Sequence, residues 1–442
     1  MGSSAMNRRH FLKVTGATAA VAGTGVVGIL AAGRAPAHAQ GAKLHILRWN
    51  DFIPQADAEL KRQAVEAGKA LGAEITFEFV ATNDLQPRIT ASIQSGWGAD
   101  IIMMLWNWPQ LYANSLVDVS DVAEPAGAAQ GGFYDVWSAT AKAGGRWLAV
   151  PHSVGGFFAN YRRSWHEEIG VKEFPKTWEE WREVGKKMKA KGKPVGQSLG
   201  RGLDPATFSY PLLWDFGGAE VDESGKKVVI NSKATLDSVK FLQAFWKDAC
   251  DESGLGWDDT TNNRAFLAGE LSATPNGPSI YILAKRQQDK LKDEKGAPLY
   301  LDIEHAFLPK GPVRQVHLNT PFQHAVPKYS KNQKLAKDFL RWHHQRENYE
   351  KWFMVNEGYS MGAGKAWEDH PMWSRIDKPL QLMRQMVRLS LMMGYPGPAS
   401  AKATEASSKF IIPDMYAQAA RGMKAEDAVK WAETELKKVY EG

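Results

Sequence analysis

KLHILR (residues 43–48), EITFEFV (residues 74–80) and DIIMML (residues 100–105) are the stretches of this sequence that decide its fold. All three are short and apolar enough for strands, and the last is a continuous apolar run of the kind found in buried parallel strands. Helical patterns separate them, over residues 57–71 and 84–95. This alternation predicts a parallel sheet with crossover helices, and therefore an α/β fold.

The residues that follow two of these strands are candidates for ligand binding. Such sheets bind ligands in the crevice at the carboxyl ends of their strands. The first strand ends in Trp49-Asn50-Asp51-Phe52. The third is followed by Trp106-Asn107-Trp108, which offers two flat rings and one amide within a single loop. A sugar presents apolar C–H faces and a rim of hydroxyls, so this combination suits a carbohydrate. Any of these tryptophans can instead belong to the packing of the protein interior.

A second α/β unit begins after Pro151. Residues 157–161 have the composition of a strand, and Thr177 and Glu180 form a capping box that opens a helix. Trp178 and Trp181 follow at helical spacing, which is more typical of a core than of a ligand site. Cys250 is the single cysteine and lies in an apolar helical pattern, so we expect a buried thiol and no internal disulfide.

The N-terminus has the pattern of an export signal. Arg8-Arg9 precede an apolar run over residues 14–32, and the small residues Ala37 and Ala39 flank His38. Paired arginines in this position are typical of the twin-arginine (Tat) signal, so we expect Tat export and cleavage after Ala39, giving a periplasmic protein. A membrane anchor is the alternative. Residues 1–39 hold four of the six net positive charges, and the nearly balanced remainder argues against a nucleic-acid partner.

Motifs for catalysis and metal binding are weak. Residues 358–362 match the nucleophile pattern G-x-S-x-G around Ser360, but the long helical pattern over residues 332–356 precedes it where a strand is needed. His343 and His344 are adjacent on that pattern and point to different faces. We therefore predict a protein that is not an enzyme and that uses no metal or cofactor, with a secreted hydrolase as a remote alternative.

Five segments in the same order resemble the extracellular solute-binding proteins of ABC importers, a family that includes the maltose-binding protein. The segments are residues 145–153, 160–180, 213–232, 266–278 and 325–340. The resemblance implies a two-lobe periplasmic-binding-protein fold of type II, with three crossings between the lobes and the ligand in the cleft. It assigns residues 40–152 and 277–322 to the N-terminal lobe, and residues 153–276 and 323–442 to the C-terminal lobe.

The resemblance also nominates site residues. Asp51 matches a sugar-binding carboxylate of the family, and Ser279 stands where maltose-type proteins place a stacking tryptophan, which puts maltodextrin specificity in doubt. Asn276 lies in the same segment as Ser279, and the late loops that face the cleft in relatives contain Tyr359, Ser360, Tyr395 and Pro396. Two further candidates come from the sequence itself. Trp214 lies in an apolar stretch that suits core or pocket equally, and His152 is available to an anionic ligand.

The expected function is capture of a carbohydrate or polyol by hinge closure, followed by delivery to the transmembrane subunits of an ABC permease. The implied partners are the solute, the permease and the Tat machinery, and we expect a monomer. The main alternative is a non-sugar solute such as a polyamine or a phosphorylated or sulfonated polyol. A cationic solute would use the tryptophans by cation–π contact with Asp51 as counter-charge. An anionic one would need His152, Arg201 or Lys402.

Overall fold

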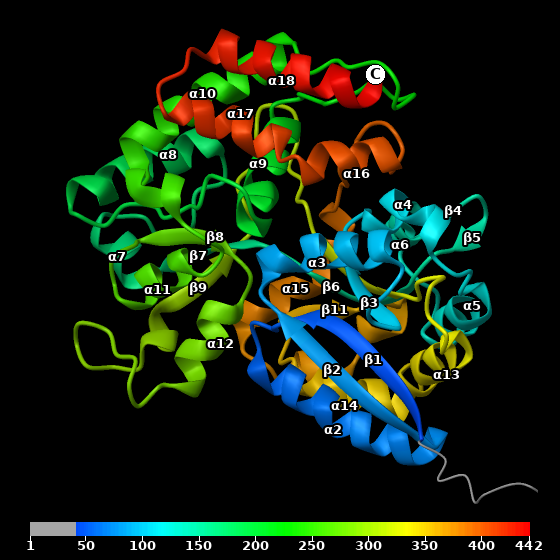
Figure 1. The fold of residues 1–442 in the computed structure, drawn as a ribbon. Coiled ribbons are helices and arrows are strands. Elements are labelled where there is room, and N and C mark those ends of the chain that lie inside the picture. Colours follow the sequence, from blue (N-terminus) through cyan, green and yellow to red (C-terminus); the bar gives the residue numbers. More distant parts are fainter. Residues whose placement is uncertain (1–40) are drawn as a thin grey trace, which may run out of the picture. The chain divides into compact units, whose positions relative to one another are not determined.

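The computed structural model describes residues 41–442, which form a six-stranded and a three-stranded β-sheet covered by helices, together with a two-stranded sheet of β4 (Lys142–Ala143) and β5 (Arg146–Trp147) (Figure 1). The expected signal sequence and its cleavage site after Ala39 lie outside the described residues. Within residues 41–442, no helix has the length and apolarity needed to cross a membrane. The larger sheet has the strand order β11-β6-β10-β3-β1-β2. Its strands are β1 (Ala42–Trp49), β2 (Ala73–Val80), β3 (Ile101–Leu105), β6 (Val150–Gly155), β10 (Thr320–Ala325) and β11 (Ser360–Gly362).

The β-α-β-α-β pattern at the start of the sequence is confirmed. The helices α2 (Pro54–Leu71) and α3 (Thr82–Ser95) connect β1, β2 and β3, and β1 pairs with β3 in parallel through Ile46 and Ile101. Gly72 ends α2 at a φ of 65°, a conformation that a residue without a Cβ adopts at little cost. β3 is buried along its whole length, as its continuous apolar run predicts.

The smaller sheet has three strands in the order β8-β7-β9. These are β7 (Phe158–Arg162), β8 (Ala273–Asn276) and β9 (Ile303–Ala306), and β7 pairs antiparallel with both neighbours. Only Gly156 and Phe157 separate β6 of the larger sheet from β7 of the smaller one. A Cβ on Gly156 would lie 2.9 Å from Met386 Cγ, so this link requires a residue without a side chain. The chain thus passes from one sheet to the other almost directly.

Strand pairing divides the chain differently from the expected lobe boundaries. β9 lies within residues 277–322, yet it pairs with β7 of the smaller sheet. The second half of β10 and all of β11 lie within residues 323–442, yet both strands pair with β6 of the larger sheet. The difference arises because antiparallel returns from distant segments complete each sheet, and short strands carry little sequence signal for their partner. We propose that the lobes follow the two sheets.

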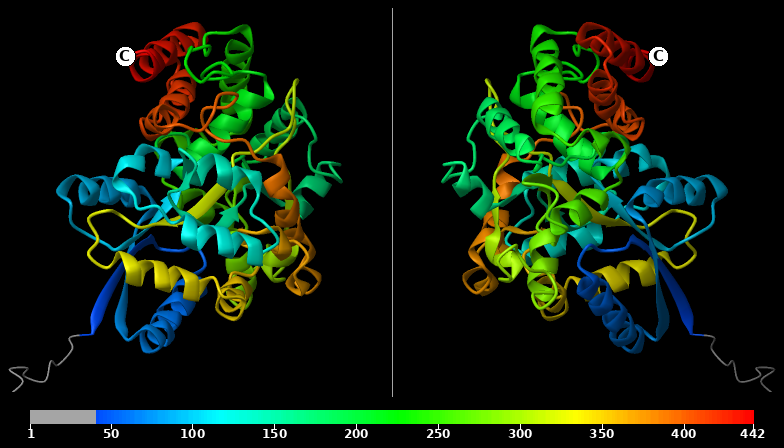
Figure 2. Two further views of the ribbon diagram at one scale, coloured as in Figure 1. Left: turned by 90° about the vertical axis from the view of Figure 1, so that its right-hand side faces the viewer. Right: turned by 90° about the vertical axis from the view of Figure 1, so that its left-hand side faces the viewer.

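Helices cover both sheets. Helices α2, α13 and α14 lie together beside the larger sheet, and helices α10, α17 and α18 lie together at the far end of the smaller-sheet lobe (Figures 1 and 2). The long helical pattern over residues 332–356 is broken, since α13 ends at His343 and α14 begins at Arg346. Besides α2 and α3, the main helices are α8 (Trp178–Ala190), α9 (Leu203–Asp215), α10 (Lys233–Ala249), α12 (Ser279–Arg286), α13 (Gln333–His343), α14 (Arg346–Val355), α16 (Ala401–Ser408), α17 (Ile411–Ala420) and α18 (Ala425–Tyr440).

The core of the smaller-sheet lobe confirms three predictions. The capping box of Thr177 and Glu180 opens α8, and the Trp178 side chain is fully buried. Its indole N–H donates to Asp215 Oδ2 at 3.0 Å, so the one polar atom of this ring is satisfied in the interior. Burial raises the pKa of Asp215 to about 8. Cys250 is buried as expected.

A cluster of four buried histidines lies between the larger sheet and helices α13 and α14. His152, on β6, has its Nε2 3.1 Å from Nε2 of His343. His343 Nδ1 lies 2.9 Å from Gln63 Oε1, and Arg48 Nη1 donates to His324 Nε2 at 2.5 Å. Burial lowers the pKa of all four histidines, including His344, so neutral imidazoles fill this interior.

These histidines predict a loss of stability in acid. Burial lowers the pKa of His344 to about 4 in the folded protein. The unfolded chain, in which the His344 pKa is near 6.5, therefore takes up a proton first as pH falls, and this uptake lowers the free energy of unfolding. Between pH 7.5 and 5.0 this amounts to about 2 kcal/mol. Urea unfolding at both pH values should therefore show that the free energy of unfolding falls by about 2 kcal/mol more in the wild type than in His344→Gln. Equal losses in the two proteins would contradict a buried neutral His344.

Candidate functional site

A cavity of about 620 Å³ lies between helix α3 and the loop after β3 on one side and helix α9 on the other. The larger-sheet lobe contributes a wall from α3 and the rings of Trp106, Trp108 and Tyr112. The opposite wall contains Leu203 and Ala206 of α9, and Met393, Ser408 and Phe410 from the C-terminal part of the chain also line the cavity. A cavity of this size, walled by both lobes, suits a small-molecule ligand.

Trp106 and Trp108 form the aromatic wall. Their ring centroids lie 6.1 Å apart at an interplanar angle of 79°, and each side chain is 5% exposed. Trp106 has a φ of 46°, which is rare for a bulky residue. Strand β10 holds it there, because Trp106 N–H donates to the backbone carbonyl of Pro321 at 3.2 Å and the Gln323 side chain donates from Nε2 to Trp106 O at 2.5 Å. Strain of this kind persists where surrounding structure fixes it, often at binding sites.

Asn107 does not line this cavity, although it stands between the two tryptophans. Its side chain is fully buried, and its Nδ2 lies 3.5 Å from Met393 O. Its backbone carbonyl accepts from Thr404 Oγ1 at 2.8 Å. The side-chain amide expected to bind ligand thus contacts the segment before α16, and the backbone carbonyl of the same residue joins the loop to α16. The sequence could not show this, because the direction of the side chain depends on the turn into the next helix.

Four other candidates lie where the two lobes meet. Tyr359 lies near Phe52, with a ring-centroid distance of 6.3 Å, and a Cβ on Gly277 would lie 3.3 Å from the Tyr359 ring. Asn276 donates to Asn263 Oδ1, and Asn263 Nδ2 donates to Ser279 Oγ at 3.3 Å. The fourth candidate is Asp51. Burial of the Tyr359 phenol, together with the charge of Asp51, raises the pKa of Tyr359. These residues bring a carboxyl, a phenol and amides to the junction.

Burial raises the pKa of the carboxyls near this junction. It raises the pKa of Asp51 to about 7, against the effect of the Ile53 N–H, which donates to Asp51 Oδ1 at 2.8 Å. Burial, together with the charge of Asp259, raises the pKa of Asp204 well above its usual range. Asp259 accepts the backbone N–H groups of Leu203 and Asp204, each at 3.1 Å, at the start of α9. These acids therefore act in large part as hydrogen-bonding groups.

Other predicted residues lie in the packed interior. His152 belongs to the buried histidine cluster, and Trp214 is fully buried on α9 with its ring 5.3 Å from Tyr210. Ser360 lies in β11, where its N–H and Oγ both donate to Asn356 Oδ1. Ser360 was expected on a loop facing the cleft, and Trp214 in a stretch that suits core or pocket equally, but the strand or helix that holds each of the three residues turns its side chain into the core.

Tyr395 and Pro396 are half-buried on the segment before α16. Arg314 Nη1 donates to the Tyr395 hydroxyl at 2.6 Å, and Tyr395 lines a separate cavity of about 500 Å³ together with Tyr134 and Met392. Met393 belongs to both cavities. The two residues therefore lie behind the wall of the tryptophan cavity, and Pro396 lines neither.

The sequence interpretation missed most of the wall formed by α3. Thr82, Gln86, Thr90 and Gln94 recur every four residues and all line the cavity. Such spacing places them on one helical face. A polar stripe on a crossover helix next to a strand end was the available signal, but it has the same pattern as a solvated helix face. Leu203, Ala206 and Phe410 carried no signal, because apolar helix positions are ordinarily core.

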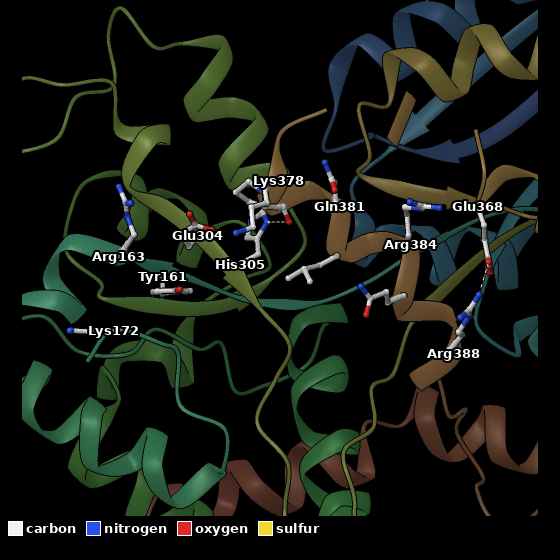
Figure 3. A pocket seen from close by; sticks show the side chains of 13 residues that line it. Tyr161, Arg163, Lys172, Glu304, His305, Glu368, Lys378, Gln381, Arg384 and Arg388 are labelled. Atoms are coloured by element: carbon white, nitrogen blue, oxygen red, sulfur yellow. Dashed lines mark hydrogen bonds and ion pairs between the residues drawn. The ribbon is translucent and has the colours of Figure 1, made fainter. Parts of the chain in front are cut away.

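A second cavity, also of about 620 Å³, lies between β7, β9 and residues 378–388 (Figure 3). Its lining is highly charged and includes Arg163, Glu304 and Lys378. Arg388 pairs with Glu368 at 2.8 Å, as the dashed line in Figure 3 marks. The tryptophan cavity differs sharply, since Arg201 is the one charged residue among its described lining residues, and Arg201 is paired with Asp414 at 2.9 Å.

The part of the chain that the structure describes contains no candidate metal site, since no three His, Cys, Asp or Glu side chains there are grouped to hold an ion.

The model of the bacterial extracellular solute-binding protein family matches residues 54–343, well over half of the chain. This protein belongs to that family. A twin-arginine signal model matches residues 5–25, so the protein is exported to the periplasm. Family members are substrate-binding components of ABC transporters and not enzymes.

Curated relatives agree with this family over part of their length. A probable ABC transporter-binding protein of Deinococcus radiodurans is 25% identical over 55% of this chain and 57% of its own length. A putative binding protein of Brucella abortus is 22% identical over 50% of this chain and 54% of its own length. The chain thus aligns with little more than half of each relative.

Solved structures of the same fold cover nearly the whole chain. A maltose-bound Thermotoga maritima protein has a TM-score of 0.75 and 21% identity, covering 90% of this chain and 99% of its own. A solute-binding protein of Agrobacterium radiobacter in complex with ribitol has a TM-score of 0.74 and 18% identity, covering 90% and 98%. An Arthrobacter chlorophenolicus sugar transporter with bound laminaribiose has a TM-score of 0.75 and 16% identity, covering 90% and 99%. The two-lobe fold follows.

The geometry predicts different effects for cavity and core tryptophans. A buried aromatic anchor contributes about 2–4 kcal/mol, or roughly 30- to 1000-fold in affinity. Trp106→Ala and Trp108→Ala should each weaken solute binding in calorimetry to that extent. Trp178→Ala should instead lower stability by about 3–5 kcal/mol and leave the affinity of the folded fraction near normal. If neither cavity variant weakens binding tenfold, the cavity is not the site.

Proposed function

We propose that this protein captures a neutral carbohydrate or polyol in the tryptophan cavity and delivers it to the transmembrane subunits of an ABC permease. The observation that carries the proposal is the cavity itself, which combines two tryptophan rings with neutral polar side chains and a single charged residue already held in an ion pair. Aromatic platforms suit the C–H faces of a sugar, and amides and hydroxyls suit its rim. The solved structures of similar fold that hold maltose, ribitol and laminaribiose support the same solute class.

Hinge closure is the proposed mechanism of capture. The lobes, taken by sheet, are joined by the two-residue link between β6 and β7, by residues 307–319 between β9 and β10, and by the segment before α16. Side chains also meet across the junction, since Gln86 of α3 donates to Ser408 of α16 at 2.5 Å and Arg286 of α12 pairs with Glu357 at 2.9 Å. A solute that contacts both walls would favour the closed state over the open one, which is the condition for signalling to the permease.

A charged solute is the alternative class. An anion would find no free cation in the described lining of the tryptophan cavity, since Arg201 is paired with Asp414. A polyamine has a better case, because Asp51, Asp204 and Asp259 all lie near Tyr359. Burial weakens that case, because it holds the pKa of Asp51 near 7 and that of Asp204 higher than normal.

A thermal-shift panel tests the solute class. It should contain neutral sugars and polyols, polyamines, and phosphorylated or sulfonated polyols, each added to the exported protein. Binding to the folded state stabilises it by about 2.7 kcal/mol at a solute concentration one hundred times Kd, so a true solute should raise the melting temperature by several degrees. We expect shifts from neutral members. Shifts confined to the polyamines or to the anionic members would refute the carbohydrate proposal.

A further inference from the structure

The buried part of the tryptophan cavity lacks polar side chains on the α9 side. Leu203 and Ala206 of α9 and Met393 line it and are 5%, 3% and 1% exposed. None of the three offers a hydrogen-bonding side-chain group. Leu105, at the end of β3, is equally buried and lines the same cavity. The deep part of the cavity is therefore an apolar floor, here defined by Leu105, Leu203, Ala206 and Met393.

The polar lining residues lie toward the rim or are already bonded. Asn83 and Gln94 of α3 are exposed. Gln86 donates to Ser408, and the Thr90 hydroxyl lies 2.6 Å from the hydroxyl of Tyr112. The Trp106 indole N–H has no hydrogen-bond partner among the described residues. A solute inside the cavity thus meets free polar side chains mainly at the rim, and apolar surface at depth.

A continuous set of polar contacts leads from the apolar floor to the junction of the lobes. Leu203 directly precedes Asp204, whose Oδ2 accepts from Asn262 Nδ2 at 2.8 Å. Asn263 follows and bonds both Asn276 and Ser279. These residues are bonded to one another and lie outside the described lining of the cavity, so the side chains that can bind hydroxyls within it are those of its rim, such as Asn83 and Gln94.

From this division, and resting on the proposed function, we infer that the solute is a carbohydrate that carries an apolar substituent, such as an aryl or alkyl glycoside. The apolar floor holds the substituent, and the polar side chains at the rim of the cavity hold the hydroxyls. A free sugar seated in the same place would press hydroxyls against Leu203, Ala206 and Met393. Each hydroxyl would lose its bonds to water without gaining a partner, which is unfavourable. An apolar substituent gains free energy from the same contact.

Matched pairs of glycosides test the inference on the exported protein. Methyl and phenyl β-glucosides, β-galactosides and β-xylosides are titrated by calorimetry, so that each pair differs only in the substituent. For every sugar that binds, the phenyl member should bind at least tenfold more tightly. Equal affinities within each pair, or binding of methyl members alone, would overturn the inference and leave the carbohydrate proposal standing. If no glycoside of either kind binds, the carbohydrate proposal fails as well.

Two variants locate the preference. Ala206→Ser adds a hydroxyl to the apolar floor with little change in size, and Leu203→Asn makes the same wall polar. Each should reduce the phenyl-to-methyl affinity ratio at least threefold, because it weakens binding of the phenyl member more than binding of the methyl member. Ala91→Ser is the matched control, because Ala91 lies on α3 at the exposed rim of the same cavity. If Leu203→Asn fails to fold, Ala206→Ser carries the test alone. An unchanged ratio in Ala206→Ser would overturn the assignment of the floor.

Discussion

The structure depends on one strand, β10, which must return from far along the chain to lie between β3 and β6. Its pairings with both neighbours are antiparallel and run through Phe322, Gln323 and His324. Because β6 continues within two residues into the smaller sheet, the returning strand also fixes how the second unit is attached to the first. The chain can reach the position of β10 only after β9 is complete, so two crossings between the sheets are unavoidable.

The same strand shapes the binding cavity. Gln323 is fully buried and donates to the carbonyl of Trp106, which holds that residue in a left-handed conformation. Loss of this buried hydrogen bond would destabilise the fold, because the carbonyl of Trp106 would be left buried without a partner. The position of the Trp106 ring is therefore a property of the sheet, and the loop after β3 inherits its order from β10. A platform held in place before the solute arrives loses less freedom on binding.

Sequence patterns were enough to predict the α/β fold, the first three strands with their helices, the α8 capping box and the buried Trp178. They also placed Trp106 directly after β3, because the continuous apolar run ends at Leu105, but Trp108 begins helix α4 (Trp108–Leu111) instead of sharing one loop with Trp106. Partners in space were harder. Nothing in the pattern around Asn107 shows that its amide turns toward Met393, and nothing around His152 shows three other histidines from later segments packing beside it. The apolar wall of Leu203 and Ala206 is indistinguishable from core until the two lobes are brought together.

The central claim is that the solute lies between Trp106 on one lobe and Leu203 and Ala206 on the other. The most direct test is a crystal structure of the protein in complex with a solute that a binding assay has identified. Density for the solute should fill the tryptophan cavity, in contact with residues of both α3 and α9. Density confined to the charged cavity between β9 and residues 378–388, with the tryptophan cavity empty, would contradict the claim.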